Sequence, residues 1–389
     1  MTVHNEKKLK VLQVVGRMNR GGAEVMLMDL YRNLSDDISF DFLINYKVKQ
    51  GIATGDFDSE IEGLGGSIKY IGAQWDIGPI KYIKEFKRIT KELGKPDVIH
   101  IHLNAKSGLI ALAAKLSGIN KIIVHSHGML KTDFTSLKTS LSSIELIFQR
   151  MLINVFTTDY WACSEQAFKS LFYKFTLKSN KKQLINNAID IHKFISVDKC
   201  VSLTIKNTHG NGRFIIGVVG RIVKSKNLLF VVEILKVLQD SKLDFICIVV
   251  GRVDDYNYMK EVEIKIQAYQ LKDKIKFLGL SDDIPLVMST FDIFISPSEK
   301  EAFGMVAAEA QAAGLPCLLS NNYPDSIDMK LGLVTFLNIL NPVVWADNIL
   351  ESNYKRIVSK DLILNTFQEL GFDVNNNILK VESVYRNNG

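Results

Sequence analysis

The feature of this sequence that most limits its fold is an alternation of short apolar runs with longer amphipathic stretches. In the first half, the apolar runs Lys10–Val15 and Val98–Leu103 are each followed, after a loop, by a stretch with the spacing of a helix. Short apolar runs are typical of strands buried on both faces, and strands that alternate with helices form parallel sheets. The first half of the chain therefore predicts an α/β domain with a parallel sheet.

The same alternation starts again after a polar segment, 196–212, in which asparagine and glycine residues lie close together. Clusters of this kind are typical of loops and linkers. A chain of 389 residues is also longer than an ordinary single domain. We therefore predict two Rossmann-like domains, at 1–195 and 213–374, which this linker joins. A predicted C-terminal helix at 375–389 could pack back on the first domain.

Two parallel sheets that face each other across a cleft provide a particular kind of binding site. Open parallel sheets bind ligands beyond the carboxyl ends of their strands, where the following helices begin. Each helix N-terminus offers unpaired N–H groups and the positive end of the helix dipole, and both suit a diphosphate. We therefore expect an α/β fold with two Rossmann-like domains and a ligand site in the cleft between them.

The composition excludes several classes of protein. No apolar run reaches the roughly 18 residues needed to span a bilayer, and the polar segment Met1–Lys10 lacks the apolar core of a signal peptide. The four cysteines form no CxxC pair, so neither a disulfide framework nor a zinc site is indicated. Residues 1–195 carry 27 Lys+Arg against 19 Asp+Glu, a net charge of +8, whereas residues 196–389 carry 21 against 23, a net charge of −2. We expect a cytoplasmic protein with a basic first half.

The strongest local signal is the segment 301–309, which follows a predicted strand and runs into a predicted helix. Glu301 precedes this helix, and Glu309 lies about two turns into it. Carboxylates accept hydrogen bonds from sugar hydroxyls, and the first N–H groups of a helix are free to bind phosphate or sugar oxygens. Two glutamates at this spacing would by themselves also be ordinary surface residues of a helix. With the N–H groups they predict a sugar-nucleotide site, to which four further residues belong: Phe303, Gly304, Met305 and Val306.

A second signal is the basic turn that begins at Gly220 and ends before a predicted helix. Gly220 lets the backbone turn at the end of a strand, and two cations, Arg221 and Lys226, follow it. A guanidinium can bind two oxygens at once, and an ammonium adds a point charge. Together they could neutralise a diphosphate leaving group, although a solvated basic turn would have the same composition.

The first half adds a glycine pair and a group of histidines. Gly21 and Gly22 open a predicted helix and would let the backbone approach a ligand closely, although the chain contains neither a GxGxxG motif here nor a Walker A motif. His127 ends a predicted strand, from which it would point into the cleft. Three more histidines lie on or near predicted strands: His100, His102 and His125. Four histidines can indicate a metal site, but no Asp-x-Asp or HExxH motif accompanies them, so we expect no metal.

These motifs occur in the order found in the retaining glycosyltransferases of family 4, which have the GT-B fold, and the chain resembles this family over nearly its whole length. Gly21–Glu24 is similar to the family's N-terminal glycine loop, and Gly220–Asn227 to its GR…KN motif. Pro297–Ala310 is similar to its PS…EGFG…EA stretch, with Ala302 in place of the commoner glycine. The loop Ser320–Asp328 looks more like that of members that assemble capsular polysaccharide or exopolysaccharide. Two further segments resemble family motifs: Asp97–Ser107 and Asn187–Asp190.

The resemblance implies a role for each matching residue on the donor side. Arg221 and Lys226 would hold the diphosphate of the nucleotide-sugar donor. Glu301 would bind hydroxyls of the donor sugar, and Glu309 would bind the ribose. The backbone near the start of the predicted helix would supply further contacts, from Phe303, Gly304, Met305 and Val306.

The resemblance also implies how the first half takes part and which reaction follows. His127 would lie near the donor sugar and the acceptor, and Gly21 and Gly22 would border the diphosphate and the acceptor. Members of the family transfer a sugar with retention of configuration and need no metal or other cofactor. We expect a UDP-sugar donor, a saccharide or lipid-linked saccharide acceptor, and no nucleic-acid partner.

Residues 129–159 combine apolar side chains with a few basic ones, in the pattern of a pair of amphipathic helices. Such helices bind at membrane interfaces, but helices that pack on a sheet have the same pattern. Together with a basic half and a lipid-linked acceptor, the segment suggests a peripheral contact with an anionic membrane surface. We expect this contact at the inner face of the cell membrane.

Other functions agree less well with these motifs. A GT-B sugar-nucleotide epimerase, or a non-catalytic paralogue that only binds a sugar nucleotide, would keep the same fold, and fold alone does not separate these alternatives. The complete set of charged motif residues favours a transferase over both. A nicotinamide-dependent dehydrogenase would need a glycine fingerprint that the chain lacks.

Overall fold

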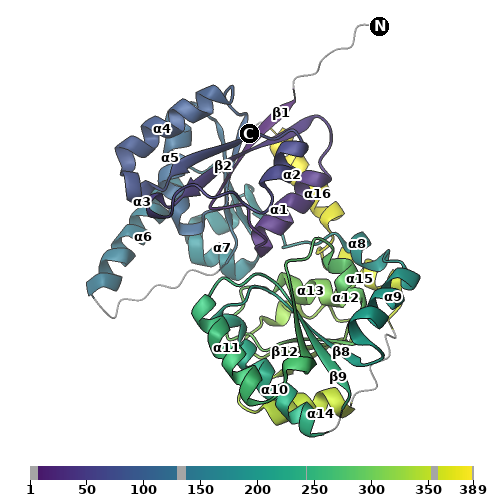
Figure 1. Cartoon of the computed structure of the whole chain (residues 1–389). Coiled ribbons are helices and arrows are strands. Elements are labelled where there is room, and N and C mark those ends of the chain that lie inside the picture. Colours follow the sequence, from purple (N-terminus) through teal and green to yellow (C-terminus); the bar gives the residue numbers. More distant parts are fainter. Residues whose placement is uncertain (1–7, 129–136, 242, 352–357, 388–389) are drawn as a thin grey trace. The chain divides into compact units, whose positions relative to one another are not determined.

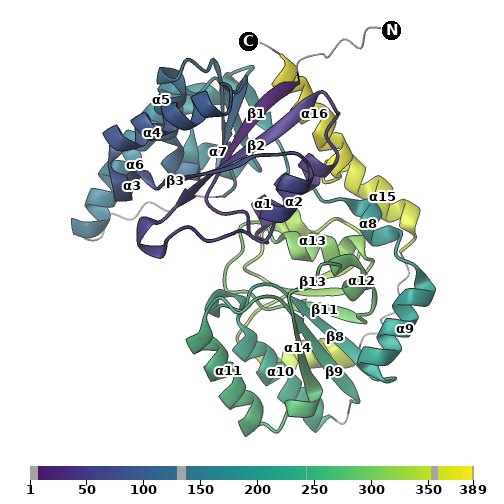
Figure 2. The same ribbon diagram turned by 45° about the horizontal axis from the view of Figure 1, so that its top comes forward.

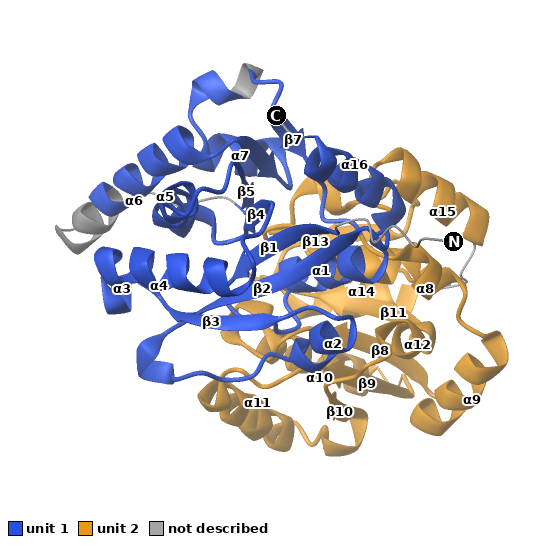
Figure 3. Ribbon diagram, turned by 90° about the horizontal axis from the view of Figure 1, so that it is seen from above, with its two compact units in different colours: residues 1–188, 374–389 blue, residues 189–373 orange. Residues whose placement is uncertain are grey.

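The computed structural model describes residues 8–128, 137–241, 243–351 and 358–387 (Figure 1). The chain forms two compact units. Unit 1 comprises Met1–Ala188 and Val374–Gly389, and unit 2 comprises Ile189–Asp373 (Figure 3). Each unit contains an open parallel sheet with helices on both faces. The predicted α/β fold with two Rossmann-like domains is therefore confirmed.

Unit 1 is built on a seven-stranded parallel sheet with the order β3-β2-β1-β4-β5-β6-β7. Its strands are β1 (Leu9–Val15), β2 (Ile38–Tyr46), β3 (Ile68–Gly72), β4 (Val98–Ile101), β5 (Lys121–Ser126), β6 (Asp159–Ala162) and β7 (Lys182–Leu184). Its helices are α1 (Gly22–Arg32), α2 (Asp58–Gly63), α3 (Gln74–Ile77), α4 (Pro79–Glu92), α5 (Gly108–Leu116), α6 (Leu137–Phe156), α7 (Glu165–Leu171) and α16 (Val374–Arg386). Three short 3-10 helices complete it: η1 (Val48–Gln50), η2 (Asn104–Ser107) and η3 (Lys174–Lys178).

The strand β1 shows why the apolar runs of this unit are nearly continuous. Successive side chains of a strand point to opposite faces of the sheet. Leu12 and Val14 belong to a core with residues of α4 and α5, whereas Val11 and Val15 belong to a core with residues of α1 and α16 (Figure 2). The strand is apolar on both sides because helices cover both faces.

The C-terminal helix α16 is held in unit 1 by contacts at both of its ends. Near its start, the Nδ2 atom of Asn377 donates a hydrogen bond to the carbonyl of Asn186 over 2.7 Å. At its end, the ammonium group of Lys121 donates to the carbonyl oxygens of Val384 and Asn387. A cation at a helix C-terminus also interacts favourably with the helix dipole.

Unit 2 is built on a six-stranded parallel sheet with the order β10-β9-β8-β11-β12-β13. Its strands are β8 (Phe214–Val219), β9 (Phe245–Val250), β10 (Ile275–Gly279), β11 (Ile293–Ser296), β12 (Cys317–Ser320) and β13 (Val334–Leu337). Its helices are α8 (Ile191–Ile195), α9 (Lys199–Gly210), α10 (Leu228–Asp240), α11 (Tyr256–Ala268), α12 (Ile284–Ser289), α13 (Met305–Ala312), α14 (Pro342–Glu351) and α15 (Lys360–Glu369). Three 3-10 helices complete it: η4 (Lys224–Lys226), η5 (Lys272–Lys274) and η6 (Asp325–Ile327).

The polar segment 196–212 differs from the linker that the sequence suggested. Most of it forms the helix α9, and the division between the units falls between Ala188 and Ile189. The polar residues that looked like a linker cap this helix: the side chain of Asp198 accepts hydrogen bonds from two N–H groups at its start, and Asn211 ends it in the left-handed conformation.

The predicted pair of amphipathic helices in 129–159 also differs from the structure. Residues 129–136 lie outside the described residues, and 137–156 form the single helix α6. None of the helices in the described part of the chain is long and apolar enough to cross a membrane.

Candidate active site

Both units reverse their strand order beside their first strand, between β1 and β4 in unit 1 and between β8 and β11 in unit 2. Ligands of open α/β sheets bind at the carboxyl ends of the strands that flank such a reversal. The predicted site residues lie in the loops and helix starts that follow these strands and, in unit 1, β5. They form two groups, one in each unit.

In unit 2 the loops after β8 and β9 touch through two glycines. The Gly251 backbone has a φ of 148°, and a Cβ atom there would lie 1.9 Å from the carbonyl oxygen of Gly220. Gly220 itself has a φ of 150°, and the space beside its Cα is bounded by the side chain of Lys226. Glycine is required here because the two backbones approach more closely than any side chain would permit.

The ion pair between Lys226 and Glu301 is the centre of this group. The Nζ atom of Lys226 contacts the Oε1 atom of Glu301, so the loops after β8 and β11 are joined by opposite charges. The hydroxyl of Tyr323 donates to the same Oε1 atom over 3.5 Å and lies 2.7 Å from the hydroxyl of Ser296. Burial, followed by the charge of Glu301, raises the pKa of Tyr323, so this phenol keeps its proton and can donate.

The start of α13 lies directly after this ion pair along the chain. Gly304 is its N-cap residue and has a φ of 97°, and a Cβ atom there would lie 2.2 Å from the ring of Tyr323. The side chain of Phe303 is buried and stacks on Phe372 with 5.1 Å between the ring centroids. The side chain of Phe303 is therefore taken up by packing, and the contact of its backbone with a ligand stays a prediction. The first N–H groups of α13, at Met305 and Val306, have no acceptor within the helix.

Arg221, the second cation of the basic turn, pairs with a carboxylate that the sequence did not suggest. The guanidinium of Arg221 is 57% exposed and forms an ion pair of 3.3 Å with Asp254, which also pairs with Arg252 at 2.7 Å. Burial alone would raise the pKa of Asp254, but the two arginines hold it below its usual value. Arg221 is thus engaged at the rim of this group, whereas Lys226 contacts Glu301. Glu309 lies half-buried in the second turn of α13.

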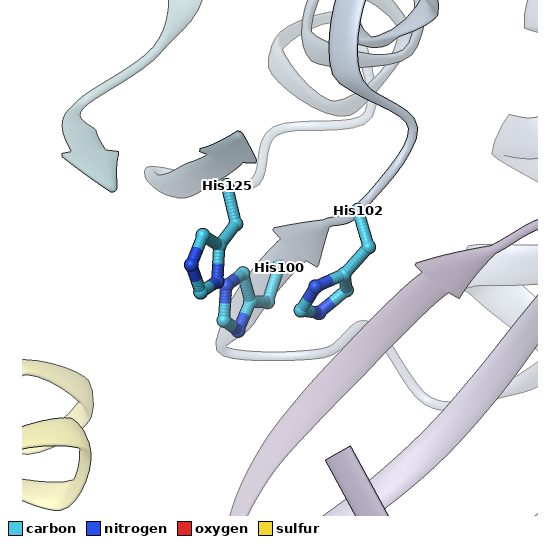
Figure 4. A group of neighbouring side chains, drawn as sticks. All are labelled: His100, His102 and His125. Carbon is cyan, nitrogen blue, oxygen red and sulfur yellow. The ribbon is translucent and has the colours of Figure 1, made fainter. Parts of the chain in front are cut away.

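In unit 1 the four histidines come together at the ends of β4 and β5. The rings of His100 and His125 are parallel within 3° with centroids 5.4 Å apart, and His102 lies 4.1 Å from His100 (Figure 4). His127 follows, 4.1 Å from His125. The Nδ1 atom of His102 lies 2.8 Å from the Nε2 atom of His127. The Nδ1 atom of His100 lies 2.7 Å from the hydroxyl of Tyr385, whereas neither nitrogen of His125 is hydrogen-bonded within the described residues.

Burial keeps this histidine group uncharged at neutral pH. Desolvation lowers the pKa of His100, His102 and His125 well below 6.5, and the neighbouring imidazoles lower these pKa values further. Desolvation lowers the pKa of His127 to about 4, and the side chain of Asn187 raises this pKa by a smaller amount. The group is therefore a set of neutral donors and acceptors.

Three of these rings, His100, His102 and His125, also present nitrogen atoms that all lie within 4.8 Å of one another and could hold a metal ion. Both nitrogens of His102 are already engaged, one with His127 and the other with Gln13. A metal ion bound by all three would have to displace one of these hydrogen bonds.

The glycine pair of unit 1 stands at the start of α1. Gly21 is the N-cap residue, and a Cβ atom there would lie 2.3 Å from a carboxylate oxygen of Glu24. Gly22 is the first residue of the helix. The Glu24 carboxylate therefore occupies the space beside the Cα atom of Gly21, and the roles of the two glycines in ligand binding stay predictions.

Several residues of these two groups had no signal in the sequence analysis. Tyr323, Ser296 and Asp254 surround the charged pairs of unit 2, and Gln13 and Tyr385 contact the histidines of unit 1. Tyr323 lies in the loop Ser320–Asp328, and the resemblance of this loop to that of polysaccharide-assembling members is the one sequence feature that draws attention to it.

Two family models match the chain, one in each half. Residues 52–158 match the model of glycosyl transferase 4-like proteins, and residues 203–326 match the model of glycosyl transferases group 1. Among curated proteins, the chain is 32% identical to the putative glycosyltransferase EpsF of Bacillus subtilis, over 98% of this chain and 97% of that protein. It is 26% identical to an Escherichia coli UDP-Gal:alpha-D-GlcNAc-diphosphoundecaprenol alpha-1,3-galactosyltransferase, over 78% of each.

Solved structures agree on the fold. The Anabaena protein Alr3699/HepE in complex with UDP superimposes with a TM-score of 0.74, over 96% of this chain and 99% of that one, at 19% sequence identity. Because the similarity to EpsF extends over almost the whole chain and both halves match glycosyltransferase models, the chain belongs to the group 1 and 4-like glycosyltransferases, with the GT-B fold.

Proposed function

We propose that this glycosyltransferase transfers a sugar from a UDP-sugar to a saccharide or lipid-linked saccharide during the synthesis of a capsular polysaccharide, an exopolysaccharide or another surface glycan. Relatives named for such pathways support the pathway, and they include a capsular polysaccharide glycosyltransferase of Staphylococcus aureus and an O-antigen glycosyltransferase of Escherichia coli. The relative named for a UDP-Gal donor and a diphosphoundecaprenol acceptor, and the neighbour solved with UDP, support the substrates.

The Lys226–Glu301 ion pair, beside the start of α13, is the observation that carries this proposal. Lys226 is positioned to bind a phosphate oxygen, and the first N–H groups of α13 can bind further oxygens of the donor. Glu301 is held in place by Lys226 and Tyr323 and can accept hydrogen bonds from sugar hydroxyls. Arg221 would exchange Asp254 for the diphosphate, and Glu309 would bind the ribose.

For the chemical step we propose a same-face displacement without a metal ion. The bond between the anomeric carbon and the diphosphate oxygen breaks, and the acceptor hydroxyl oxygen bonds to that carbon on the same face. The acceptor's proton passes to the leaving phosphate oxygen, so the anomeric configuration is retained. Lys226 and Arg221 would stabilise the negative charge that develops on the diphosphate, a role that a divalent cation has in other enzymes.

A thermal-shift screen tests the donor. The purified protein would be titrated with UDP, GDP and ADP and with their common sugar conjugates, since a ligand that binds only the folded state raises the unfolding temperature. We expect UDP and one UDP-sugar to stabilise the protein selectively. A selective shift with GDP or ADP would contradict the proposed donor.

A transfer assay in the presence of EDTA tests the reaction. With the stabilising UDP-sugar and a lipid-linked saccharide acceptor, we expect product of retained configuration and an unchanged rate in EDTA. Loss of activity that Mn²⁺ or Mg²⁺ restores would contradict the metal-free step. Donor binding without transfer to any acceptor would favour the non-catalytic alternative, and conversion of the UDP-sugar to its epimer would favour the epimerase.

We also propose that α6 brings unit 1 to the inner face of the cell membrane, where a lipid-linked acceptor would be found. One side of this helix carries five apolar side chains at helical spacing, each between 45% and 65% exposed: Ile144, Ile147, Phe148, Met151 and Val155. An apolar stripe on a basic domain is typical of helices that lie in an anionic membrane surface.

Sedimentation with lipid vesicles tests this contact. We expect the protein to bind vesicles with anionic lipid at low salt, and binding to fall in Ile147→Ser/Phe148→Ser. The matched control is Leu379→Ser, which removes a 72% exposed leucine from α16. Protein that stays in the supernatant at low salt, or equal loss in both variants, would contradict the proposal.

A further inference from the structure

Polar side chains from β1, β4 and β5 lie on the face of the unit 1 sheet that α16 covers, with Trp161 of β6 beside them. Gln13 of β1 pairs in register with His100 of β4, and His125 of β5 pairs with Trp161 of β6. All four side chains are fully buried. Their neighbours on the same face are apolar, among them Val11, Val98 and Ile123. Buried polar groups are unfavourable unless they are hydrogen-bonded, and Gln13 and His100 both have hydrogen-bond partners within unit 1.

A continuous chain of hydrogen bonds runs from His127 to the C-terminal helix. His127 Nε2 lies 2.8 Å from His102 Nδ1, and His102 Nε2 lies 2.8 Å from Gln13 Oε1. The Nε2 atom of Gln13 donates to the hydroxyl of Tyr385 over 3.3 Å. That hydroxyl lies 2.7 Å from His100 Nδ1. His127 and His102 are half-buried, whereas Gln13, Tyr385 and His100 are fully buried.

The carboxamide of Gln13 determines which atoms donate and which accept along this series of hydrogen bonds. Its oxygen can only accept, so the Nε2 atom of His102 must carry a proton. A neutral imidazole has one N–H group, so the Nδ1 atom of His102 accepts, and His127 must donate from Nε2. The Nδ1 atom of His127 is then left with a lone pair. No described residue lies in hydrogen-bond geometry to this nitrogen, although the side chain of Asn187 interacts with His127 and opposes the effect of burial on its pKa.

The remaining bonds agree with this direction. Tyr385 has a single hydroxyl proton, and because it accepts from Gln13 it can donate that proton to His100. Burial holds the pKa values of His100 and His102 far below neutrality and that of His127 at about 4. None of these three imidazoles therefore gains a second proton at pH 7. A second proton would turn an accepting nitrogen into a donor.

We propose that Gln13 and Tyr385 are positioning residues that hold His127 in the tautomer with a free lone pair on Nδ1, so that it accepts a hydrogen bond from a substrate hydroxyl. This inference rests on the proposed function only where it places His127 at the substrate. A neutral acceptor selects hydroxyl groups and repels phosphate oxygens. The diphosphate is thus left to the cations of unit 2, and unit 1 contributes to the recognition of a sugar or acceptor hydroxyl.

The tautomer can be measured directly by NMR on protein labelled with 15N-histidine. The chain has seven histidines, and the signals of His127 are those that His127→Asn removes. At pH 7 we expect the Nε2 atom of His127 to be protonated and its Nδ1 atom to be bare in the wild type. Gln13→Leu removes the acceptor and should change the ratio of the two tautomers by about fivefold, the size expected for one neutral hydrogen bond. Gln13→Glu restores the acceptor for His102 but not the donor to Tyr385, and should return the tautomer ratio of His127 toward the wild-type value.

Two phenol variants separate this role from general stability. Tyr385→Phe removes the next member of the chain and should shift the His127 signals less than Gln13→Leu does. Tyr82→Phe is the matched control, because Tyr82 is fully buried in the other core of unit 1 and bonds to an amide, 2.7 Å from Asn45. It should leave the signals of His127 unchanged.

The outcomes distinguish this proposal from the proposed function. A proton on Nδ1 of His127 in the wild type, or signals that neither Gln13→Leu nor Tyr385→Phe changes, would overturn the positioning role even in an active transferase. If the tautomer responds as expected, Gln13→Leu should lower kcat/KM about fivefold, and Gln13→Glu should recover it. A responsive tautomer with unchanged kcat/KM would overturn the contact with substrate. A wild type that transfers no sugar would overturn that contact and the proposed function together.

Discussion

The two units have the same strand order around their first strand and opposite chemistry at the same place. Beside β1 and β4, unit 1 carries neutral imidazoles, an amide and a phenol. Beside β8 and β11, unit 2 carries the ion pairs of Lys226 with Glu301 and of Arg221 with Asp254. The fold supplies strand ends and helix N-termini in both units, so the difference lies in the side chains. A charged group suits phosphate, and a neutral acceptor suits a hydroxyl.

The largest effect should follow from breaking the ionic group of unit 2. Glu301→Ala should reduce transfer by at least about 100-fold, the scale of losing one well-placed interaction at the reacting centre. The fold should stay intact, but the unfolding temperature should fall, because Lys226 and Tyr323 both lose their partner. Glu299→Ala is the control, because its side chain is exposed on the same loop, and we expect its rate within about twofold of the wild type. Near-normal turnover in Glu301→Ala would remove this residue from the site.

Acid should destabilise unit 1 at a higher pH than unit 2, because the buried, neutral histidines of unit 1 resist protonation. The folded-state pKa of each buried histidine lies below the value of about 6.5 in the unfolded chain, and that of His127 is about 4. The unfolded state therefore binds more protons as the pH falls from 6.5 to 4. Stability that is present above pH 6.5 should be lost over this range, with a slope of up to about 1.4 kcal/mol per pH unit for each histidine.

Urea unfolding at several pH values measures this slope, and pulse-labelled hydrogen exchange at one fixed labelling pH shows which unit opens. Unit 1 should lose protection at a higher pH than unit 2. His125→Phe should reduce the slope by about one proton, because both nitrogens of His125 lack partners within the described residues and its ring packs on His100 and Trp161. An unchanged slope would show that His125 titrates normally.

A smaller effect should follow from changing the backbone at the start of α13. Gly304→Ala adds a Cβ atom 2.2 Å from the ring of Tyr323 at a φ of 97°, and should destabilise the protein by about 1–3 kcal/mol. Gly332→Ala is the control: its φ is 69°, but a Cβ atom there would meet nothing within 4 Å. It should cost about 1 kcal/mol from backbone strain alone. Equal losses of urea stability would mean that Tyr323 moves away freely.

The smallest effect should come from Arg221, whose guanidinium is more than half exposed. Arg221→Ala should weaken UDP binding about tenfold, less than a buried charged contact would give. Asp254→Asn frees Arg221 from its partner and should leave UDP binding as tight as in the wild type, or tighter. Isothermal titration measures both dissociation constants. Weaker binding in Asp254→Asn would indicate that Asp254 holds Arg221 in place for the diphosphate.

Local sequence patterns predicted the structure correctly where a feature depends on residues close together in the sequence. The apolar runs predicted β1 and β4, and the motif residues Lys226 and Glu301 proved to be in contact. The prediction of a linker at 196–212 was wrong, because the residues that cap a helix are the same as those that form linkers. The short strands β3 and β13 were not predicted, because each has only a few residues with no alternation to mark it.

The sequence by itself determined the fold class and the family, since periodicity and ordered motifs are written in residues close together in the chain, and it predicted which charged residues would bind the donor. Only the tertiary structure decided the partners of these residues. Tyr385 reaches Gln13 across 372 positions, and Tyr323 reaches Glu301 across 22. Burial, which makes the histidines neutral, and the direction of their hydrogen bonds depend on which strands lie side by side. Those properties follow from strand order and packing, which no local pattern specifies.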